Sequence, residues 1–415
     1  MPRLLLLLPT ETYRAEDFVR AAERLGVELT VASEEPNVLA ATNPAGYLAL
    51  DFDDPARAAA QAADFARRHP IAAVVGVDDR TAVVAAAVAQ RLGLPANPVA
   101  AARAARNKAE SRERLAQAGL PVPRFARFGL DEEPGAVARA VARRIGFPCV
   151  VKPLVLSASR GVIRADDEAS LAAAVRRVGA ILRDPEVAAC GEGAREILVE
   201  AFVPGREVAL EGLLAGGRLH VLALFDKPDP LDGPYFAETI YVTPSRLPAG
   251  VQEAIAACTA RAAAALGLAI GPVHAELRVG EAGPVILEVA ARSIGGRCSR
   301  ALRFDPGVSL EELILAQALG RELPPPEREH RAAGVLMLPV PRAGRLVAIS
   351  GQAEARAVPG VEEVLITAHP GQAVRPLPEG AQYLGFVVAR GDSPEAVEEA
   401  LREAWRRLAV VIEPA

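Results

Sequence analysis

The sequence predicts an α/β protein that continues into an α+β segment, and three observations support this prediction. The first hundred residues alternate apolar strand runs with helices, which is typical of βαβ units on a parallel sheet. Between residues 196 and 289, strand runs come in pairs joined by short turns, which indicates hairpins. After residue 332, short Val-rich strands precede one helix at 393–408. The chain has 415 residues, 51% of them apolar, which is enough for roughly two to four domains.

Residues 1–97 form the first predicted domain. No Gly-x-Gly-x-x-Gly pattern follows its first strand, so this Rossmann-like layer lacks a dinucleotide fingerprint. Asp78, Asp79 and Arg80 follow the last strand and either cap the next helix or touch a substrate; the cap is favoured. The expected strands are at 3–8, 27–31, 47–52 and 71–75, and the expected helices at 15–25, 55–68 and 81–92.

Residues 98–325 form the second predicted domain, and residues 326–415 form the third. The second domain contains a subdomain of about 121–203. The pair Pro204 and Gly205 lies between two strand runs and predicts a hairpin turn. The other expected features are a helical stretch at 98–119, a linker at 121–123, a helix at 251–266, a hairpin of 273–279 with 285–289, and a boundary at the three prolines 324–326.

The composition excludes several classes of protein. The formal net charge is −5 and no basic cluster is interleaved with aromatic residues, so nucleic acid is not an expected partner. The opening apolar run, residues 4–8, is too short for a signal peptide or a membrane span, so we expect a soluble cytoplasmic protein with no membrane partner. The cysteines lack metal-binding spacing and are expected to be reduced and buried; they are Cys149, Cys190, Cys258 and Cys298.

The chain uses its two cationic residue types very unevenly. Arginine supplies nearly every positive charge, and lysine occurs at three positions only, Lys108, Lys152 and Lys227. A site that needs a compact ammonium rather than a planar guanidinium would keep a lysine. Chance is the alternative explanation for so small a number.

Lys152 ends an apolar strand, and small residues follow it at 157–162. Small side chains let backbone N–H groups approach phosphate oxygens, while Lys152 and Arg160 supply charge. This pattern indicates a phosphate-binding loop, and a surface loop beside an edge lysine is the alternative. Further along, a strand run ends at Glu200, where a carboxylate can accept a proton from an adenine amino group. Glu207 follows where it could hold ribose hydroxyls, although a solvated hairpin is the simpler interpretation of these two residues.

Two further carboxylates, Glu276 and Glu288, lie on the two apolar strands of the second hairpin. They can converge on one hard cation, and magnesium suits two carboxylates together with phosphate oxygens. Without a metal or an arginine between them, inward carboxylates on buried strands would repel each other. His274 precedes Glu276 on the same strand, and we expect it to pack beside the metal rather than to bind it.

In order and spacing, these residues resemble the ATP-grasp superfamily. The match runs from Asn107 and Lys108 through Lys152, Glu200 and Glu276 to the segment 288–296. The resemblance spans the chain and implies an ATP-grasp fold with a Rossmann-like pre-ATP-grasp domain, a lid subdomain and a small C-terminal α+β closing domain. It implies that Lys108 and Lys152 contact the phosphates of ATP and that Ser157, Ser159 and Gly161 belong to a mobile lid loop that binds the nucleotide. Glu200, Phe202 and Val203 would contact adenine, and Glu207 would contact ribose. Glu276 and Glu288 would bind Mg²⁺ or Mn²⁺.

The segment 225–241 resembles the substrate segment of the L-amino-acid ligases and related carboxylate–amine ligases. Two positions depart from that pattern: Ala290 stands where the family has a metal-binding asparagine, and Tyr241 where it has a histidine. The resemblance implies that Glu238, Tyr241, Arg292, Gly295 and Gly296 contact the substrate and that Arg292 and Lys227 are catalytic.

The expected function is therefore ATP-dependent ligation of a small-molecule carboxylate to an amine. The product would be an amide or peptide bond, formed through an acyl phosphate with release of ADP and phosphate. Three alternatives stay open: an ATP-grasp carboxylase, a purine-type ligase, and a nucleotide-binding regulatory protein whose catalysis has lapsed. A homodimer stays open as the assembly.

Overall fold

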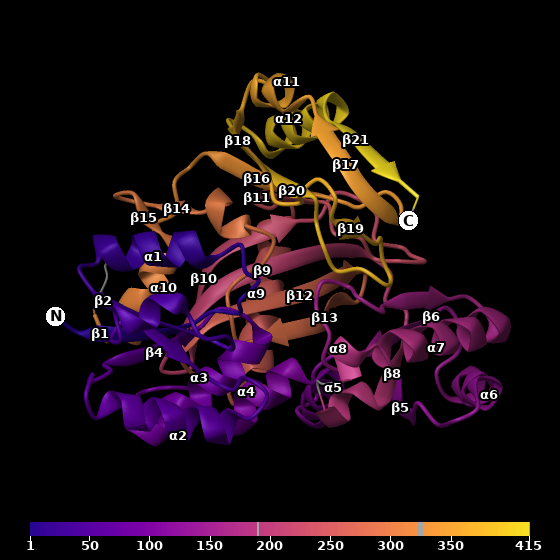
Figure 1. Ribbon diagram of the computed structural model, residues 1–415. Helices are drawn as coiled ribbons and strands as arrows, with labels where there is room; N and C mark the ends of the chain where they lie inside the picture. The colour runs from indigo at the N-terminus through magenta and orange to yellow at the C-terminus, as the bar shows by residue number, and fades with distance from the viewer. Residues whose placement is uncertain (189–190, 322–326, 415) are drawn as a thin grey trace.

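The computed structural model describes residues 1–188, 191–321 and 327–414 (Figure 1). Its N-terminal unit is a parallel sheet of four strands in the order β3-β2-β1-β4. This arrangement confirms the βαβ pattern expected for the first hundred residues. The elements are β1 (Arg3–Leu7), α1 (Ala15–Arg24), β2 (Glu28–Ser33), η1 (Val38–Ala41), β3 (Tyr47–Ala49), α2 (Pro55–Ala66), β4 (Ala73–Gly76) and α3 (Asp79–Leu92).

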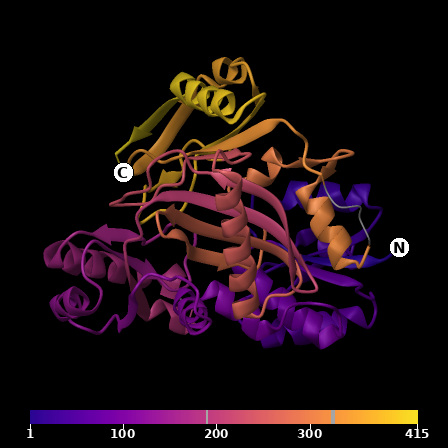
Figure 2. The same cartoon turned by 180° about the vertical axis from the view of Figure 1, so that it is seen from behind.

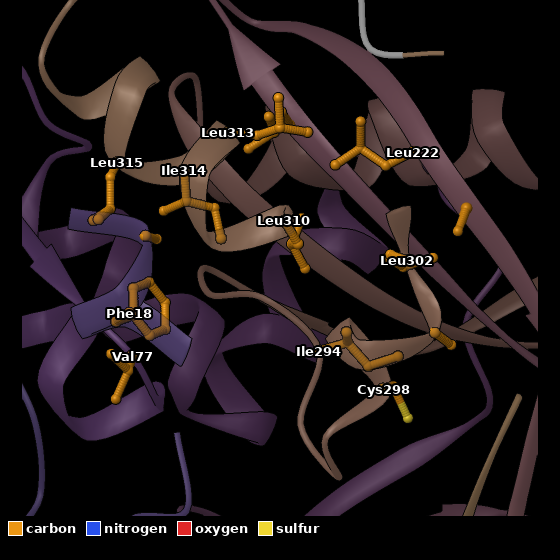
Figure 3. Close-up of a cluster of buried hydrophobic side chains, with 14 of the residues drawn as sticks. Phe18, Val77, Leu222, Ile294, Cys298, Leu302, Leu310, Leu313, Ile314 and Leu315 are labelled. Carbon is orange, nitrogen blue, oxygen red and sulfur yellow. The ribbon is translucent and has the colours of Figure 1, made fainter. Parts of the chain in front are cut away.

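Helices cover both faces of this first sheet, which explains why β1 is one unbroken apolar run. Leu4 and Leu6 point toward α1 and α10 (Leu310–Ala318), whereas Leu5 and Leu7 point toward α2 and α3. On the first of these faces, Phe18 of α1 lies next to side chains of α10 such as Ile314 (Figure 3). Sequence-distant segments therefore share one core.

The central sheet has eight strands in the order β13-β12-β9-β10-β11-β16-β20-β18. Its last three strands come from the C-terminal segment, so the expected α+β segment is anchored to the same sheet through the pairing of β11 with β16. Helix α9 lies across the sheet in the view from behind (Figure 2). The elements of this part are β9 (Arg206–Ala215), β10 (Arg218–Asp226), β11 (Ile240–Thr243), α9 (Ala249–Leu266), β12 (Gly271–Gly280), β13 (Gly283–Ala290), η3 (Cys298–Ala301), β14 (Arg303–Phe304) and β15 (Val308–Ser309).

The C-terminal segment adds a small sheet of its own, in the order β19-β17-β21. Its elements are β16 (Ala332–Leu338), β17 (Gly344–Ser350), α11 (Gln352–Arg356), β18 (Val361–Ile366), β19 (Ala373–Val374), β20 (Gly385–Gly391), α12 (Pro394–Arg407) and β21 (Ala409–Glu413). The fold class expected from the sequence is confirmed. The domain boundaries at 97 and 325 stay predictions, and the prolines 324–326 lie outside the described residues.

A separate four-stranded sheet, β5-β8-β6-β7, lies within residues 121–203, where a subdomain is expected. Its elements are β5 (Phe125–Gly129), α6 (Pro134–Arg144), β6 (Cys149–Pro153), β7 (Ile163–Ala165), α7 (Glu168–Leu182), α8 (Pro185–Ala188), η2 (Gly191–Ala194) and β8 (Glu196–Ala201). The hairpin predicted around Pro204 and Gly205 is wrong, because β8 pairs with β5 and β6 while β9 pairs with β10 and β12. The two residues connect different sheets. Gly205, at φ +118°, passes so close to Val279 that a Cβ would lie 2.4 Å from its carbonyl oxygen.

The helical stretch expected at 98–119 is two helices, α4 (Val99–Arg106) and α5 (Lys108–Gln117). Asn107 separates them, because its side chain accepts the N–H groups of Ala109 and Glu110 and so caps α5. Lys108 is thereby fixed at the first position of α5.

Among the described residues, no helix is long and apolar enough to cross a membrane. Cys149, Cys258 and Cys298 are buried free thiols, as expected, and Cys190 lies outside the described residues.

Candidate active site

A cavity of about 330 Å³ lies where the N-terminal unit, the sheet β5-β8-β6-β7 and the central sheet meet. The N-terminal unit contributes the segments that follow β1 and β4. Because β1 leads to β2 on one side and neighbours β4 on the other, these segments flank the point at which the strand order reverses. Open α/β sheets bind ligands in the crevice at such a point.

Fifteen of the residues expected to contact nucleotide, metal or substrate line this cavity: Lys108, Lys152, Ser157, Ser159, Glu200, Phe202, Val203, Glu207, Glu238, Tyr241, Glu276, Glu288, Arg292, Gly295 and Gly296. Asp78, Asp79 and His274 line it as well. Gly161 does not line it, because its N–H donates to the carbonyl of Pro378 and a Cβ there would lie 2.6 Å from the ring of Pro153. The expected nucleotide contact of Gly161 stays a prediction. Lys227 does not line the cavity, but it contacts three carboxylates that do.

Lys108 and Lys152 enter the cavity from different elements. The Nζ of Lys108 donates to the carbonyl of Leu156 at 2.8 Å and lies 3.4 Å from Oε2 of Glu288. Lys152, at the end of β6, places its Nζ 2.7 Å from Oε2 of Glu200. Two ammonium groups thus flank the small-residue loop, in which Ser159 has φ +55°.

Glu200 is buried between two cations. Arg112 donates from Nε to Oε1 at 2.5 Å, and Lys152 holds the other oxygen. Burial alone would raise the pKa of Glu200, but the attraction of Arg112 and then Lys152 outweighs it and lowers the pKa to about 2. Because both oxygens already have cationic partners, an adenine amino group would have to share Oε2 with Lys152. The adenine contact of Glu200 stays a prediction.

Sequence reasoning missed Arg112 because it is one of many arginines. The only signal was its position four residues after Lys108, which places both side chains on one face of α5. Arg278 was missed for the same reason, although it lies two residues after Glu276 on β12 and therefore points to the same side. Its guanidinium donates to Oε2 of Glu207 at 3.0 Å and lies 4.8 Å from the ring centre of Phe202.

Lys227 is enclosed by three carboxylates. Its Nζ lies 2.9 Å from Glu207, 2.8 Å from Glu238 and 2.7 Å from Glu276. Burial alone would lower the pKa of Lys227, but the three carboxylates raise it well above the usual value, so the group stays charged. Since Arg278 also binds Glu207, the cluster holds three carboxylates and two cations.

Glu276 and Glu288 lie directly opposite each other on β12 and β13. Like charges in that position repel, and two converging carboxylates are the oxygen donors that magnesium prefers. On Glu276, one oxygen, Oε1, faces Lys227, the hydroxyl of Tyr241 at 3.4 Å and Nε2 of His274 at 3.6 Å. All three contacts converge on that oxygen, so Oε2 is the oxygen that can bind a metal. The donor set of Glu276 and Glu288 therefore fits a divalent cation.

A second carboxylate group among the described residues, Glu207 with Glu238 and Glu276, also has ligand spacing, within 4.8 Å. Its members share the ammonium of Lys227, which takes the place a cation would fill. His274 packs between Glu276 and the buried Glu211, whose Oε2 lies 3.5 Å from Nδ1 of the histidine.

Arg292 also lines the cavity and pairs with Asp79 at 3.1 Å. The neighbouring Asp78 caps α3 through a reciprocal bond with Thr81, so the cap interpretation is confirmed for Asp78. Asp79, one residue later, instead reaches the site. Arg292 also donates to the carbonyl of Ser293 at 3.2 Å, and these bonds fix the plane of the guanidinium at the cavity wall.

The comparisons with known proteins agree with this geometry. The ATP-grasp N-terminal domain matches residues 19–96, the ATP-grasp domain residues 145–301, and the L-amino acid ligase C-terminal domain 2 residues 336–413. The chain therefore belongs to the ATP-grasp family of ATP-dependent ligases.

An L-amino acid ligase from Bacillus licheniformis has a similar structure, with a TM-score of 0.83 and 27% identity over 100% of this chain and 99% of that one. The uncharacterised protein y4rH of Sinorhizobium fredii is 26% identical over 100% of this chain and 84% of its own length. Alanine–anticapsin ligase of Bacillus subtilis is 27% identical over 54% of this chain and 49% of its own length, so that match spans only about half of the relative.

Proposed function

We propose that this protein is a carboxylate–amine ligase that activates a carboxylate with ATP and transfers the acyl group to an amine. The observation that carries the proposal is a single cavity lined by two sets of groups, the ammonium groups with the opposed carboxylates and Arg292 with Glu238. The first set suits a nucleoside triphosphate with magnesium or manganese. The second suits the carboxylate and the ammonium of an amino acid.

In the first step, a carboxylate oxygen of the acyl donor attacks the γ-phosphate. The bond to ADP breaks, and an acyl phosphate forms. Lys108 and Lys152 would hold phosphate oxygens, and Glu276 with Glu288 would hold the divalent cation, which neutralises charge on the transferring phosphoryl group. In the second step, a neutral amine attacks the acyl carbon, phosphate leaves, and the amine loses a proton.

The chain's own residues would contribute orientation and charge. Arg292, with its plane fixed by Asp79, would hold the donor carboxylate and then the oxyanion of the second step. Lys227 would keep Glu238 and Glu276 in place, as its contacts at 2.8 and 2.7 Å indicate. The small-residue loop at 157–162 would cover the acyl phosphate and exclude water.

The test is an ADP-release screen over amino acids, singly and in pairs, with mass spectrometry of the products. A peptide or amide product formed in a one-to-one ratio with ADP is expected. A carboxylated product that needs bicarbonate would point to the carboxylase alternative. ATP binding without ADP release over the whole panel would point to a regulatory protein, the alternative that Ala290 suggests.

A further inference from the structure

One wall of the cavity consists of uncharged side chains that take no part in the ion pairs described above. Tyr13, Ile294, Met337 and Tyr383 all line it. They come from the loop after β1, the segment after β13, strand β16 and the segment before β20. Such a set of apolar side chains, gathered from four distant segments, fits the binding of an apolar group.

Direct contacts join these residues into one surface. The hydroxyl of Tyr13 accepts the N–H of Gly296 at 2.7 Å, and a Cβ on Gly296 would lie 2.3 Å from the sulfur of Met337. The rings of Tyr13 and Tyr383 both pack against Phe386, with ring centres at 5.1 and 6.0 Å. Met337 lies directly opposite Phe386 in the sheet, which completes the wall.

The wall adjoins the two charged groups proposed to hold an amino acid. Met337 donates its N–H to the carbonyl of Thr239 at 2.7 Å, one residue from Glu238. Ile294 lies two residues from Arg292, and Tyr13 contacts the glycine two residues further on. An α-amino acid with its ammonium at Glu238 and its carboxylate at Arg292 would therefore lie beside this wall.

The geometry points to an amino acid with an apolar side chain of the size of leucine, methionine or phenylalanine as the acyl donor, with Met337 setting the depth of its pocket. This inference rests on the proposed ligase function. A charged side chain would lose hydration against these four side chains, none of which carries a charge. The flexible thioether of Met337 can adapt to several apolar shapes, so a group of donors rather than a single one is expected.

The experiment measures kcat/KM for ADP release with glycine, alanine, leucine, methionine, phenylalanine, aspartate and lysine as donors. The same amino acids are titrated calorimetrically into the protein loaded with magnesium and a non-hydrolysable ATP analogue. The wild-type protein should prefer the three large apolar donors over aspartate and lysine by at least about tenfold, in turnover and in binding. This comparison of donors uses the wild-type protein alone, so it does not depend on whether a variant folds.

The variant Met337→Ala should shift the ratio of phenylalanine to leucine turnover by on the order of tenfold, since each methylene in an apolar pocket is worth about 10–200-fold. Met337→Leu conserves volume and is the matched control; it should change that ratio by less than about twofold. A wild-type preference for charged donors, or an equal loss for every donor in Met337→Ala, would overturn the assignment of the wall.

The two proposals fail in different ways. If apolar amino acids bind in the calorimeter but no ADP is released, the pocket stands and the ligase proposal fails. If ADP is released only with glycine, aspartate or lysine, the ligase proposal stands and the pocket is wrong. If apolar amino acids neither bind nor react, the pocket is also wrong.

Discussion

The two ends of the cavity are built from different materials. The end proposed for ATP consists of paired charges, such as Lys152 with Glu200 and Lys108 with Glu288. The end proposed for the donor side chain consists of apolar side chains, such as Met337 and Tyr383, that are held by packing. Phosphate oxygens need fixed charge at fixed points, whereas discrimination between side chains depends on volume. The first end should therefore respond to changes in charge and the second to changes in size.

The largest effect is expected for Glu288→Gln. The carboxylate that faces Glu276 would hold the cation that neutralises charge in the transition state, so its loss should lower turnover by more than about a hundredfold. ATP affinity should fall much less. Steady-state ADP release and calorimetry with ATP would measure the two quantities. Glu281→Gln, in the exposed turn between β12 and β13, is the control. Turnover within about tenfold of the wild type would remove Glu288 from the proposed metal site.

Lys152→Ala should weaken ATP binding by roughly ten- to a hundredfold or more, because a charge-assisted contact with phosphate contributes about 1.5–3 kcal/mol. Glu200 would also lose one of its two cationic partners, so thermal denaturation should be followed alongside calorimetry. Arg91→Ala, an exposed residue on α3, controls for the loss of a positive charge. Unchanged nucleotide affinity would contradict the role of Lys152. Amino acid binding at the other end should be unaffected.

Ala290→Asn tests the departure from the family pattern. Ala290 is fully buried and lies opposite His274, on the same side of β13 as Glu288. An asparagine oxygen there would add a ligand, and changes around metal sites commonly alter affinity by about 10–100-fold. The magnesium concentration for half-maximal ADP release should fall. An unchanged midpoint with unchanged thermal stability would mean that position 290 does not face the cation.

The smallest effect is expected for Glu379→Gln, in the C-terminal segment. Glu379 holds Arg177 of helix α7, in the expected lid subdomain, through two bonds at 2.5 and 2.9 Å, and the adjacent Pro378 carbonyl accepts the N–H of Gly161. Because the pair is partly exposed, its loss should raise the KM for ATP by no more than about fivefold. Glu354→Gln on α11 is the control, since no ion pair of Glu354 occurs in the described part of the chain. A KM equal to that of the control would exclude a role in holding the lid.

The charged end could be predicted in part from the sequence because each of its residues lies in a short contiguous pattern. Lys152 ends an apolar strand before small residues, and Glu276 and Glu288 lie on the two strands of one hairpin. Patterns of this kind fix local geometry, and local geometry decides where such a side chain points. The fold class followed from the same kind of pattern, namely the alternation of strands and helices.

The tertiary structure alone decided which charges meet and which apolar side chains form the opposite wall. Arg112 reaches Glu200 across 88 positions of sequence, and Arg292 reaches Asp79 across 213. Tyr13 and Met337 meet at Gly296, although no pattern in the sequence connects the three. The same holds for Pro204 and Gly205, which have the composition of a hairpin turn but join two sheets. The composition of a segment and the spacing of its apolar residues indicate its conformation. Which other segment it contacts depends on packing across the whole chain, which short-range patterns do not encode.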